Sequence, residues 1–257
     1  MNLADLQTRA SAPTVLPERC HDRETLLVGF DTDADVLNAL LPAALTPDGS
    51  NSVLCEFAAT PDPRGRGSCT EFNVLIPALA KGERVLFRAY STADDGAWLP
   101  RGRTRMVIVH DTLTGILELH GRPVVIAAMN YRRAHLLEDQ RRFGTLSSAD
   151  TVRQLRPVRV AAAGDGIDAL PVQRLIAQPW SDIHVQCAWM GSASLDLLWP
   201  AGAPLAALPV HRVHGGLHCV VDFRREPLRR LCGGSATALA TEATSRYPQL
   251  VAEGGVQ

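Results

Sequence analysis

Apolar and polar residues alternate most clearly between Asp111 and Arg132, where two arms rich in β-forming residues flank a short turn. In the first arm, Thr112–Leu119, the leucines fall on one face and the threonines and glutamate on the other. The second arm, Pro123–Met129, is apolar on both faces, which is typical of a strand buried on both sides. Gly121, between the arms, can supply the positive φ that a tight turn needs. The pattern therefore predicts a central β-hairpin.

Alternating or continuous apolar runs predict the remaining strands of the chain. We expect them at Thr25–Phe30, Ser52–Ala59, Thr70–Leu79, Arg84–Tyr90, Arg105–Val109, Thr151–Ala161, Val172–Ala177, Ile183–Met190, Leu195–Trp199 and Pro209–Phe223. A short amphipathic helix is predicted where three aspartates precede Val36–Leu41, with an aspartate capping its N-terminus and Pro42 ending it. Two further helices are expected at His135–Arg142 and Gly234–Tyr247.

Many strands joined by short turns, with few helices, predict an antiparallel α+β fold. Residues 1–20 show little periodicity, so we expect an N-terminal arm followed by a single domain over residues 21–257. The chain is 46% hydrophobic and 21% charged, which is enough apolar material for a substantial core. Its 6 cysteines form no CxxC pair, which favours buried free thiols in a reducing compartment over structural zinc or disulfides.

The net charge of −1 gives no electrostatic reason to expect a nucleic acid or an anionic membrane as partner. No apolar run reaches the roughly 18 residues of a membrane span, and the first ten residues lack the basic start and apolar core of a signal peptide. We therefore expect a cytoplasmic protein.

Three nearby histidines, His211, His214 and His218, raise the question of a metal site. Strand alternation would place His211 on the face opposite to the other two, so ordinary hydrogen-bonded histidines are favoured over metal ligands. The chain contains no P-loop, nucleophile elbow or dinucleotide fingerprint that would predict a phosphate site or an activated serine.

A series of short motifs then resembles the acetoacetate decarboxylase family, from about residue 20 to about residue 225. The motifs are His21–Glu24, Thr70-Glu71 followed by Ile76-Pro77, Asp111–Leu117 with Met129–Arg132, Ala188–Gly191, and Leu208–Val210 followed by His218–Asp222. Each motif is weak alone, but together they occur in the family's order and spacing. The resemblance implies an antiparallel β-cone or barrel with an interior pocket, a few flanking helices and assembly into homo-oligomers.

The resemblance also implies roles for two residues. Arg23 matches the family arginine that helps to hold the substrate carboxylate, for which its bidentate fork is suited. Glu71 matches an acidic pocket residue that can act as a general acid or base if burial raises its pKa. The alternative is that Arg23 and Glu71 simply pair with neighbours inside the barrel. We further expect Arg103, Trp98, Trp189 and His218 to bind the substrate.

The sequence departs from the family at the lysine that forms an imine with the substrate ketone. The family lysine precedes the Asp-Thr-Leu hairpin, whereas the corresponding region here, Ser91–Arg105, contains no lysine. Lys81 is the only lysine of the chain and lies in an Ala-Lys-Gly-Glu turn. Arg101 cannot replace the imine-forming lysine of the family, because a guanidinium stays protonated and is not a usable nucleophile. Arg101 or Arg103 could still supply positive charge, although arginines at alternate positions of a strand usually mark a solvated edge.

Two functions follow from these observations. The first is a lyase-type enzyme that acts on a carbonyl-bearing acid without a lysine imine, by decarboxylation, dehydration or cyclisation, in secondary metabolism. Arg23, Glu71 and Arg101 would be its catalytic residues, with no cofactor and no metal. The second is a non-catalytic protein that binds a small molecule on the same fold.

Overall fold

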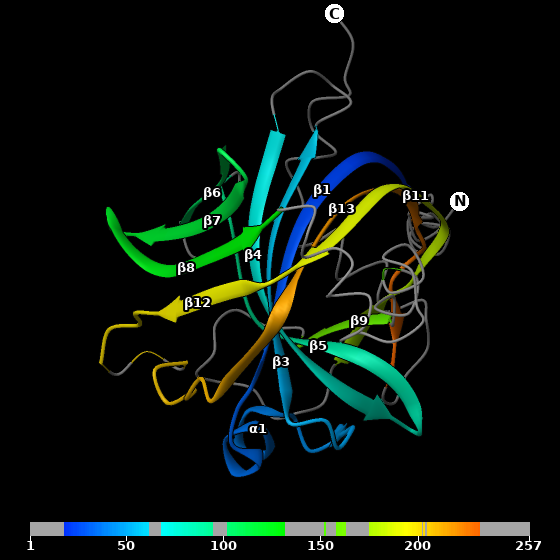
Figure 1. Cartoon of the computed structure of the whole chain (residues 1–257). Helices are drawn as coiled ribbons and strands as arrows, with labels where there is room; N and C mark the ends of the chain where they lie inside the picture. Colours follow the sequence, from blue (N-terminus) through cyan, green and yellow to red (C-terminus); the bar gives the residue numbers. More distant parts are fainter. Residues whose placement is uncertain are drawn as a thin grey trace, which may run out of the picture.

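The protein is described by a computed structural model that covers residues 18–61, 68–94, 102–131, 152, 158–162, 175–201, 203 and 205–231 (Figure 1). The larger of its two sheets contains β1 (Glu18–Asp31), β2 (Thr46–Pro47), β3 (Ser52–Pro61), β4 (Ser68–Ala80), β5 (Glu83–Ala93), β9 (Val158–Ala162), β10 (Leu175–Gln178), β11 (Trp180–Gly191), β13 (Arg212–Arg225) and β14 (Arg229–Arg230). The smaller sheet contains β6 (Gly102–Val109), β7 (Thr112–Leu119), β8 (Arg122–Asn130) and β12 (Ala193–Leu197).

The strand order in the larger sheet is β11-β13-β1-β3-β4-β5-β9-β10-β14, with β2 beside β4, and in the smaller sheet it is β12-β8-β7-β6. The pairs are antiparallel except for β5 and β9, which run parallel. The strands predicted from the apolar pattern are present, although β9 is shorter than the predicted strand at Thr151–Ala161. This arrangement confirms the predicted α+β fold with a largely antiparallel sheet.

The predicted hairpin is formed by β7 and β8, which pair from Thr112↔Asn130 to Leu119↔Arg122. His120 and Gly121 form its turn with φ values of 52° and 74°. The hairpin lies at the centre of the smaller sheet, and the leucine face of β7 is buried as expected. The prediction that β8 is buried on both faces was wrong, because Ile126, Ala128 and Asn130 on its second face are only half-buried. The smaller sheet packs on the main core with one face only.

Helix α1 (Ala34–Leu40) follows β1 and ends before Pro42, as predicted. The predicted aspartate cap was wrong: Asp33 occupies the N-cap position, but its side chain makes no capping hydrogen bond. Its Oδ1 atom instead lies 2.7 Å from His211 Nε2, so the carboxylate binds the histidine and not the N-terminus of the helix. The predicted helices at residues 135–142 and 234–247 lie outside the described residues.

β1 begins at Glu18, so the last three residues of the predicted N-terminal arm belong to this strand, and residues 1–17 lie outside the described residues. The five described cysteines form no disulfide with one another. Among the described segments there is no helix whose length and hydropathy would suit a membrane span.

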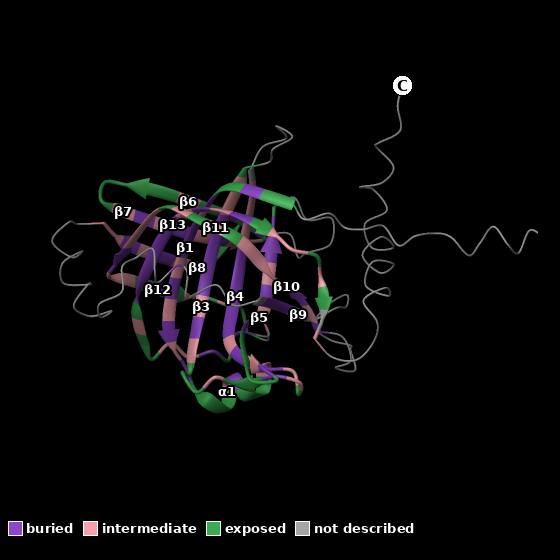
Figure 2. Ribbon diagram, turned by 90° about the vertical axis from the view of Figure 1, so that its right-hand side faces the viewer, coloured by how far each residue is buried: buried purple, intermediate pink, exposed green. Residues whose placement is uncertain are grey.

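The two faces of the larger sheet differ in character. One face packs against the smaller sheet and forms the main core, which includes Leu26, Phe57 and Phe72 from the larger sheet and Leu117 and Met129 from the smaller one. Gly115 on β7 is required here, because a Cβ at this position would lie 2.6 Å from the Phe57 ring. The opposite face carries a second apolar cluster, which consists of Cys20, Val152, Met190, Leu217, Cys219, Val221 and Phe223. Figure 2 shows the resulting burial along β1, β3 and β4.

Candidate functional site

Five charged residues lie on the second face of the larger sheet, one from each of five adjacent strands. They are Arg23 on β1, Glu56 on β3, Glu71 on β4, Arg88 on β5 and Arg159 on β9. Strand alternation turns these side chains away from the main core. Residues next to them in sequence, such as Phe57, Phe72 and Phe87, pack in that core. The side chains of Arg23 and Glu56 are almost fully buried, at 2% and 1% exposure, while Glu71 keeps 16% exposure. We call these five residues the charged network.

Arg23 is held by contacts within the network. Its Nη1 atom donates to Glu71 Oε1 at 2.6 Å and to Thr60 Oγ1 at 2.8 Å. Its Nη2 atom lies 3.5 Å from Glu56 Oε2, while no residue in the described part of the chain accepts a hydrogen bond from its buried Nε. The terminal nitrogens of Arg23 are thus engaged by the protein, and its Nε–H remains available to an acceptor.

Glu56 occupies the middle of the network. Arg159 contacts it through both terminal nitrogens, with Nη1 donating to Oε2 at 2.6 Å and Nη2 donating to Oε1. Asn73 Nδ2 donates to Glu56 Oε2 at 2.8 Å and to Glu71 Oε2 at 3.2 Å. Ser91 Oγ donates to Asn73 Oδ1 at 2.7 Å, which fixes the orientation of the amide. These contacts hold the two carboxylates rigidly.

The arginines determine the charge state of both carboxylates. Burial alone would raise the pKa of Glu56, but Arg159 and Arg23 outweigh it and lower the pKa to about 2. Burial likewise opposes ionisation of Glu71, yet Arg23, with smaller contributions from Arg88 and Arg159, holds its pKa well below the usual range. The condition under which Glu71 would act as a general acid, a pKa raised by burial, is therefore not met. Glu71 is ionised at neutral pH, so it can accept hydrogen bonds but has no proton to donate.

The network carries more positive than negative charge. Three guanidinium groups face two carboxylates, which leaves an excess of one positive charge. The excess lies with Arg88, which makes no hydrogen bond or ion pair to a described residue and whose Nε is buried without a partner. Burial lowers the pKa of Arg88, as expected for a cation that lacks full compensation. A buried excess charge of this kind favours an anionic ligand.

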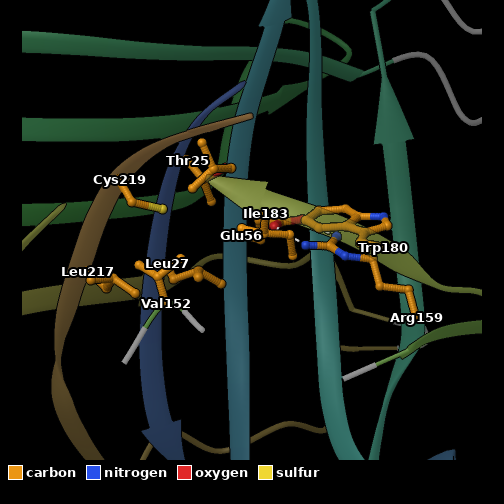
Figure 3. Close-up of a pocket in the computed structure, with 10 residues that line it drawn as sticks. Thr25, Leu27, Glu56, Val152, Arg159, Trp180, Ile183, Leu217 and Cys219 are labelled. Atoms are coloured by element: carbon orange, nitrogen blue, oxygen red, sulfur yellow. Dashed lines mark hydrogen bonds and ion pairs between the residues drawn. The ribbon is translucent and has the colours of Figure 1, made fainter. Parts of the chain in front are cut away.

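A pocket opens beside the Glu56–Arg159 end of the network (Figure 3). Its lining comprises Thr25, Leu27, Glu56, Val152, Arg159, Trp180, Ile183, Leu217, Cys219 and Val221. Trp180 stacks on Phe223 with ring centroids 3.9 Å apart, and Arg159 Cζ lies 4.3 Å from the centroid of the indole. The indole ring and the guanidinium therefore form one rigid wall of the pocket.

The structure brings together some of the residues predicted from the sequence and separates others. Arg23 and Glu71 form a direct ion pair within the network. Arg103 is exposed on β6, an edge strand of the smaller sheet, where its neighbours Gly102 and Thr104 face inward. The prediction of a solvated arginine edge is confirmed for Arg103 and for Arg105, which pairs with Glu118 at 3.0 Å. Trp98 and Arg101 lie outside the described residues.

Trp189 and His218 lie together, but on the face opposite to the network. Their rings stack with centroids 5.2 Å apart and an interplanar angle of 14°. His218 Nε2 lies 2.9 Å from Glu24 Oε1, and Nδ1 contacts the Tyr131 hydroxyl. Burial raises the pKa of Tyr131, so the phenol stays protonated and donates a hydrogen bond to Nδ1. The protonated Nε2 then donates a hydrogen bond to Glu24. This cluster satisfies its own hydrogen bonds.

The other two histidines of the predicted group also bind carboxylates. His211 contacts Asp33 at 2.7 Å and His214 contacts Asp31 at 2.6 Å. The three histidines thus have three different acidic partners, as expected of ordinary hydrogen-bonded histidines. The described part of the chain contains no group of three histidine, cysteine or acidic side chains placed to hold a metal ion.

Lys81 lies in the exposed turn between β4 and β5, with a φ of 54°. It is ten residues beyond Glu71 along the same strand direction, a distance of about 30 Å in an extended chain. A lysine side chain is far too short to reach Glu71 from there.

Three members of the network, Glu56, Arg88 and Arg159, were not predicted from the sequence. Each interrupts or ends a short apolar run within its strand: Glu56 follows Val53-Leu54-Cys55, Arg88 follows Val85-Leu86-Phe87, and Arg159 lies between Val158 and Val160. A lone charge in such a run is costly to bury unless it is paired. This pattern is the signal that could have found them.

The low pKa values of the two glutamates predict that the stability of the folded protein depends on pH in the acidic range. A carboxylate whose pKa is lowered on folding contributes stability above its unfolded pKa, and this contribution is lost as pH falls toward the folded pKa. The unfolded value here is about 4.5, and Glu56 titrates at about 2 in the folded protein. We expect the melting temperature to fall between pH 4.5 and 2 by scanning calorimetry. A melting temperature that stays constant over this interval would contradict the ion pairs described above.

Comparison with known proteins agrees with the fold. Residues 5–232 match the family model described as acetoacetate decarboxylase (ADC). An acetoacetate decarboxylase of Clostridium beijerinckii is 33% identical over 219 residues, which cover 80% of this chain and 85% of that protein. An acetoacetate decarboxylase of Streptomyces nogalater is 30% identical over 219 residues, with 80% and 86% coverage.

Two solved structures have the same fold. The acetoacetate decarboxylase of Legionella pneumophila superposes with a TM-score of 0.69 at 24% identity, covering 90% of this chain and 95% of that one. The enduracididine biosynthesis enzyme MppR, complexed with pyruvate, superposes with a TM-score of 0.66 at 21% identity, covering 85% and 92%. The chain therefore belongs to the acetoacetate decarboxylase family.

Proposed function

We propose that this protein is a lyase-type enzyme that acts on a small carbonyl-bearing acid without forming a lysine imine. The observation that carries the proposal is the excess positive charge of the charged network, together with the buried Nε–H groups of Arg23 and Arg88, which have no acceptor among the described residues. Membership of a family of decarboxylases supports a substrate with both a carbonyl and a carboxylate.

The chemistry needs only charge stabilisation and a proton donor, which water can supply. When a β-keto acid loses carbon dioxide, the electron pair of the broken C–C bond moves to the adjacent carbonyl and forms an enolate. Uncompensated guanidinium charge next to this enolate oxygen lowers the energy of the transition state. A water molecule then donates a proton to the enolate carbon, and the hydroxide that remains is neutralised by the solvent. The ionised Glu71 can accept a hydrogen bond from that water and orient it. Dehydration and cyclisation pass through a similar enolate.

The absence of an imine can be tested directly. Wild-type protein is incubated with acetoacetate or pyruvate and sodium borohydride, and the intact mass is measured. We expect no stable substrate-sized increase in mass, because Lys81 is exposed and far from the network. An increase located on Lys81 would overturn the imine-free mechanism.

Turnover is measured separately, as release of carbon dioxide or loss of the carbonyl absorbance, on a panel of β-keto acids. The amides of stable keto acids serve as binding controls, since they lack the negative charge. Binding of acids but not amides, with turnover of at least one acid, is the expected result. Equal binding of acids and amides would contradict the proposal.

One observation favours the second candidate, a non-catalytic binding protein. Both carboxylates of the network are paired with arginines and held ionised, so neither can act as a general acid. Selective binding of acids without turnover of any member of the panel would support this function instead.

We also infer that the protein forms homo-oligomers. The edge strand β6 exposes three consecutive aliphatic side chains, Val107, Ile108 and Val109, at 42%, 57% and 54%. Exposed apolar residues on an open sheet edge favour pairing with another chain. We expect Ile108→Lys to lower the mass measured by light scattering, and Leu198→Lys, at an equally exposed site elsewhere, to leave it unchanged. A monomeric wild-type protein, or equal effects of the two variants, would contradict this inference.

A further inference from the structure

We propose that the pocket beside the charged network selects a keto acid with an aliphatic tail of several carbons, larger than acetoacetate. This inference rests on the proposed function, because it assumes that the acid group is met by the network. It adds the substrate class and the residues that distinguish it.

The pocket has a charged side and an apolar side (Figure 3). Glu56, Arg159 and Trp180 lie together on one side, next to the rest of the network. On the other side lie Leu27, Leu217, Cys219 and Val152. A ligand that fills this pocket with its acid group at the charged side must therefore place its remaining atoms against apolar side chains.

The apolar side offers little to a polar substituent. Burial raises the pKa of the Cys219 thiol to about 12, so this side chain stays neutral and contributes apolar surface. Thr25 provides the one hydroxyl among the described residues that line the pocket. A hydroxyl or amino group on the ligand tail would lose hydrogen bonds to water here, whereas methylene groups would gain by leaving water.

The apolar side is also incompletely filled by the protein itself. Leu27 and Ile183 line the pocket but remain only partly buried, although they pack on the second apolar cluster. Leu217 and Cys219, on the neighbouring strand β13, are buried. An aliphatic chain lying along Leu27 and Ile183 would complete the burial of this cluster. The main core lies on the opposite face of the sheet, so it is not disturbed by such a ligand.

The experiment is a homologous series of stable keto acids, namely pyruvate, α-ketobutyrate, α-ketovalerate and α-ketocaproate, measured by isothermal titration calorimetry with the wild-type protein. Each added methylene that is buried should tighten binding by about fourfold. The same series is measured with Cys219→Phe, which fills the apolar side, and with Cys187→Phe as matched control. Cys187 lies on β11, where it pairs with Val220 of β13, and it does not line the pocket.

We expect the wild-type protein and Cys187→Phe to show the increase with chain length, and Cys219→Phe to lose it while still binding pyruvate. Affinity that is independent of chain length in the wild-type protein would overturn this inference and leave the proposed function standing. If no member of the series binds, the proposed function fails as well. Should Cys219→Phe not fold, the wild-type series alone decides the question.

Discussion

Replacing Glu56 with glutamine is expected to lower the free energy of unfolding by about 3–5 kcal/mol, because it removes one partner of a buried ion pair. Glu56 is 1% exposed and accepts from Arg159, Asn73 and, at longer range, Arg23. The variant would leave three guanidinium groups facing one carboxylate in a buried site. Urea denaturation followed by circular dichroism measures the loss.

The matched control is Glu118→Gln, which removes the ion pair with Arg105 on the smaller sheet. The side chain of Arg105 is 48% exposed, and exposed pairs typically contribute about 0–1 kcal/mol. If both variants lost the same small amount of stability, the charged network would not be a set of strong buried interactions.

Replacing Glu71 with glutamine is expected to reduce turnover by about 10²-fold, because the neutral amide cannot orient the water that protonates the enolate as the carboxylate does. Glu71 is ionised at neutral pH, and of the two network glutamates it is the more accessible to solvent. The change also removes the ion pair with Arg23, so stability falls too. Turnover must therefore be measured well below the melting temperature of the variant.

Arg23→Lys separates the two roles of Glu71, because it keeps a positive charge in the network and keeps the Glu71 carboxylate but loses the guanidinium fork that pairs with it. A loss of kcat in Glu71→Gln that exceeds the loss in Arg23→Lys assigns the orientation of the water to Glu71. Equal losses in both variants would mean that Glu71 acts only by holding Arg23. Turnover within about twofold of the wild type in folded Glu71→Gln would remove it from the mechanism.

Local patterns predicted most of the strands and the hairpin at residues 112–129, because alternation and turn glycines act over a few residues. They failed where a distant contact decides the outcome. Asp33 has the right position for an N-cap, but His211, 178 residues away, takes its carboxylate. The half-buried second face of β8 depends on which sheet it joins, and its own sequence does not contain that information.

The site was predicted only in part, for a related reason. Arg23 and Glu71 were found because they belong to motifs that resemble a known family. Glu56, Arg88 and Arg159 come from three separate strands and meet only when those strands are placed in one sheet. Their effect on the pKa of Glu71 follows from that meeting, so the direction of the shift could not be derived from the sequence.

The single lysine has a practical consequence. Lys81 is the only residue of the chain that carries a side-chain amine, and it lies exposed in the turn after β4. Amine-reactive dyes or surfaces will couple to the folded protein at this side chain, and an endoprotease specific for lysine will cut the chain after it. Because the turn is about 30 Å along the strand from Glu71, immobilisation through Lys81 leaves the charged network open to ligand.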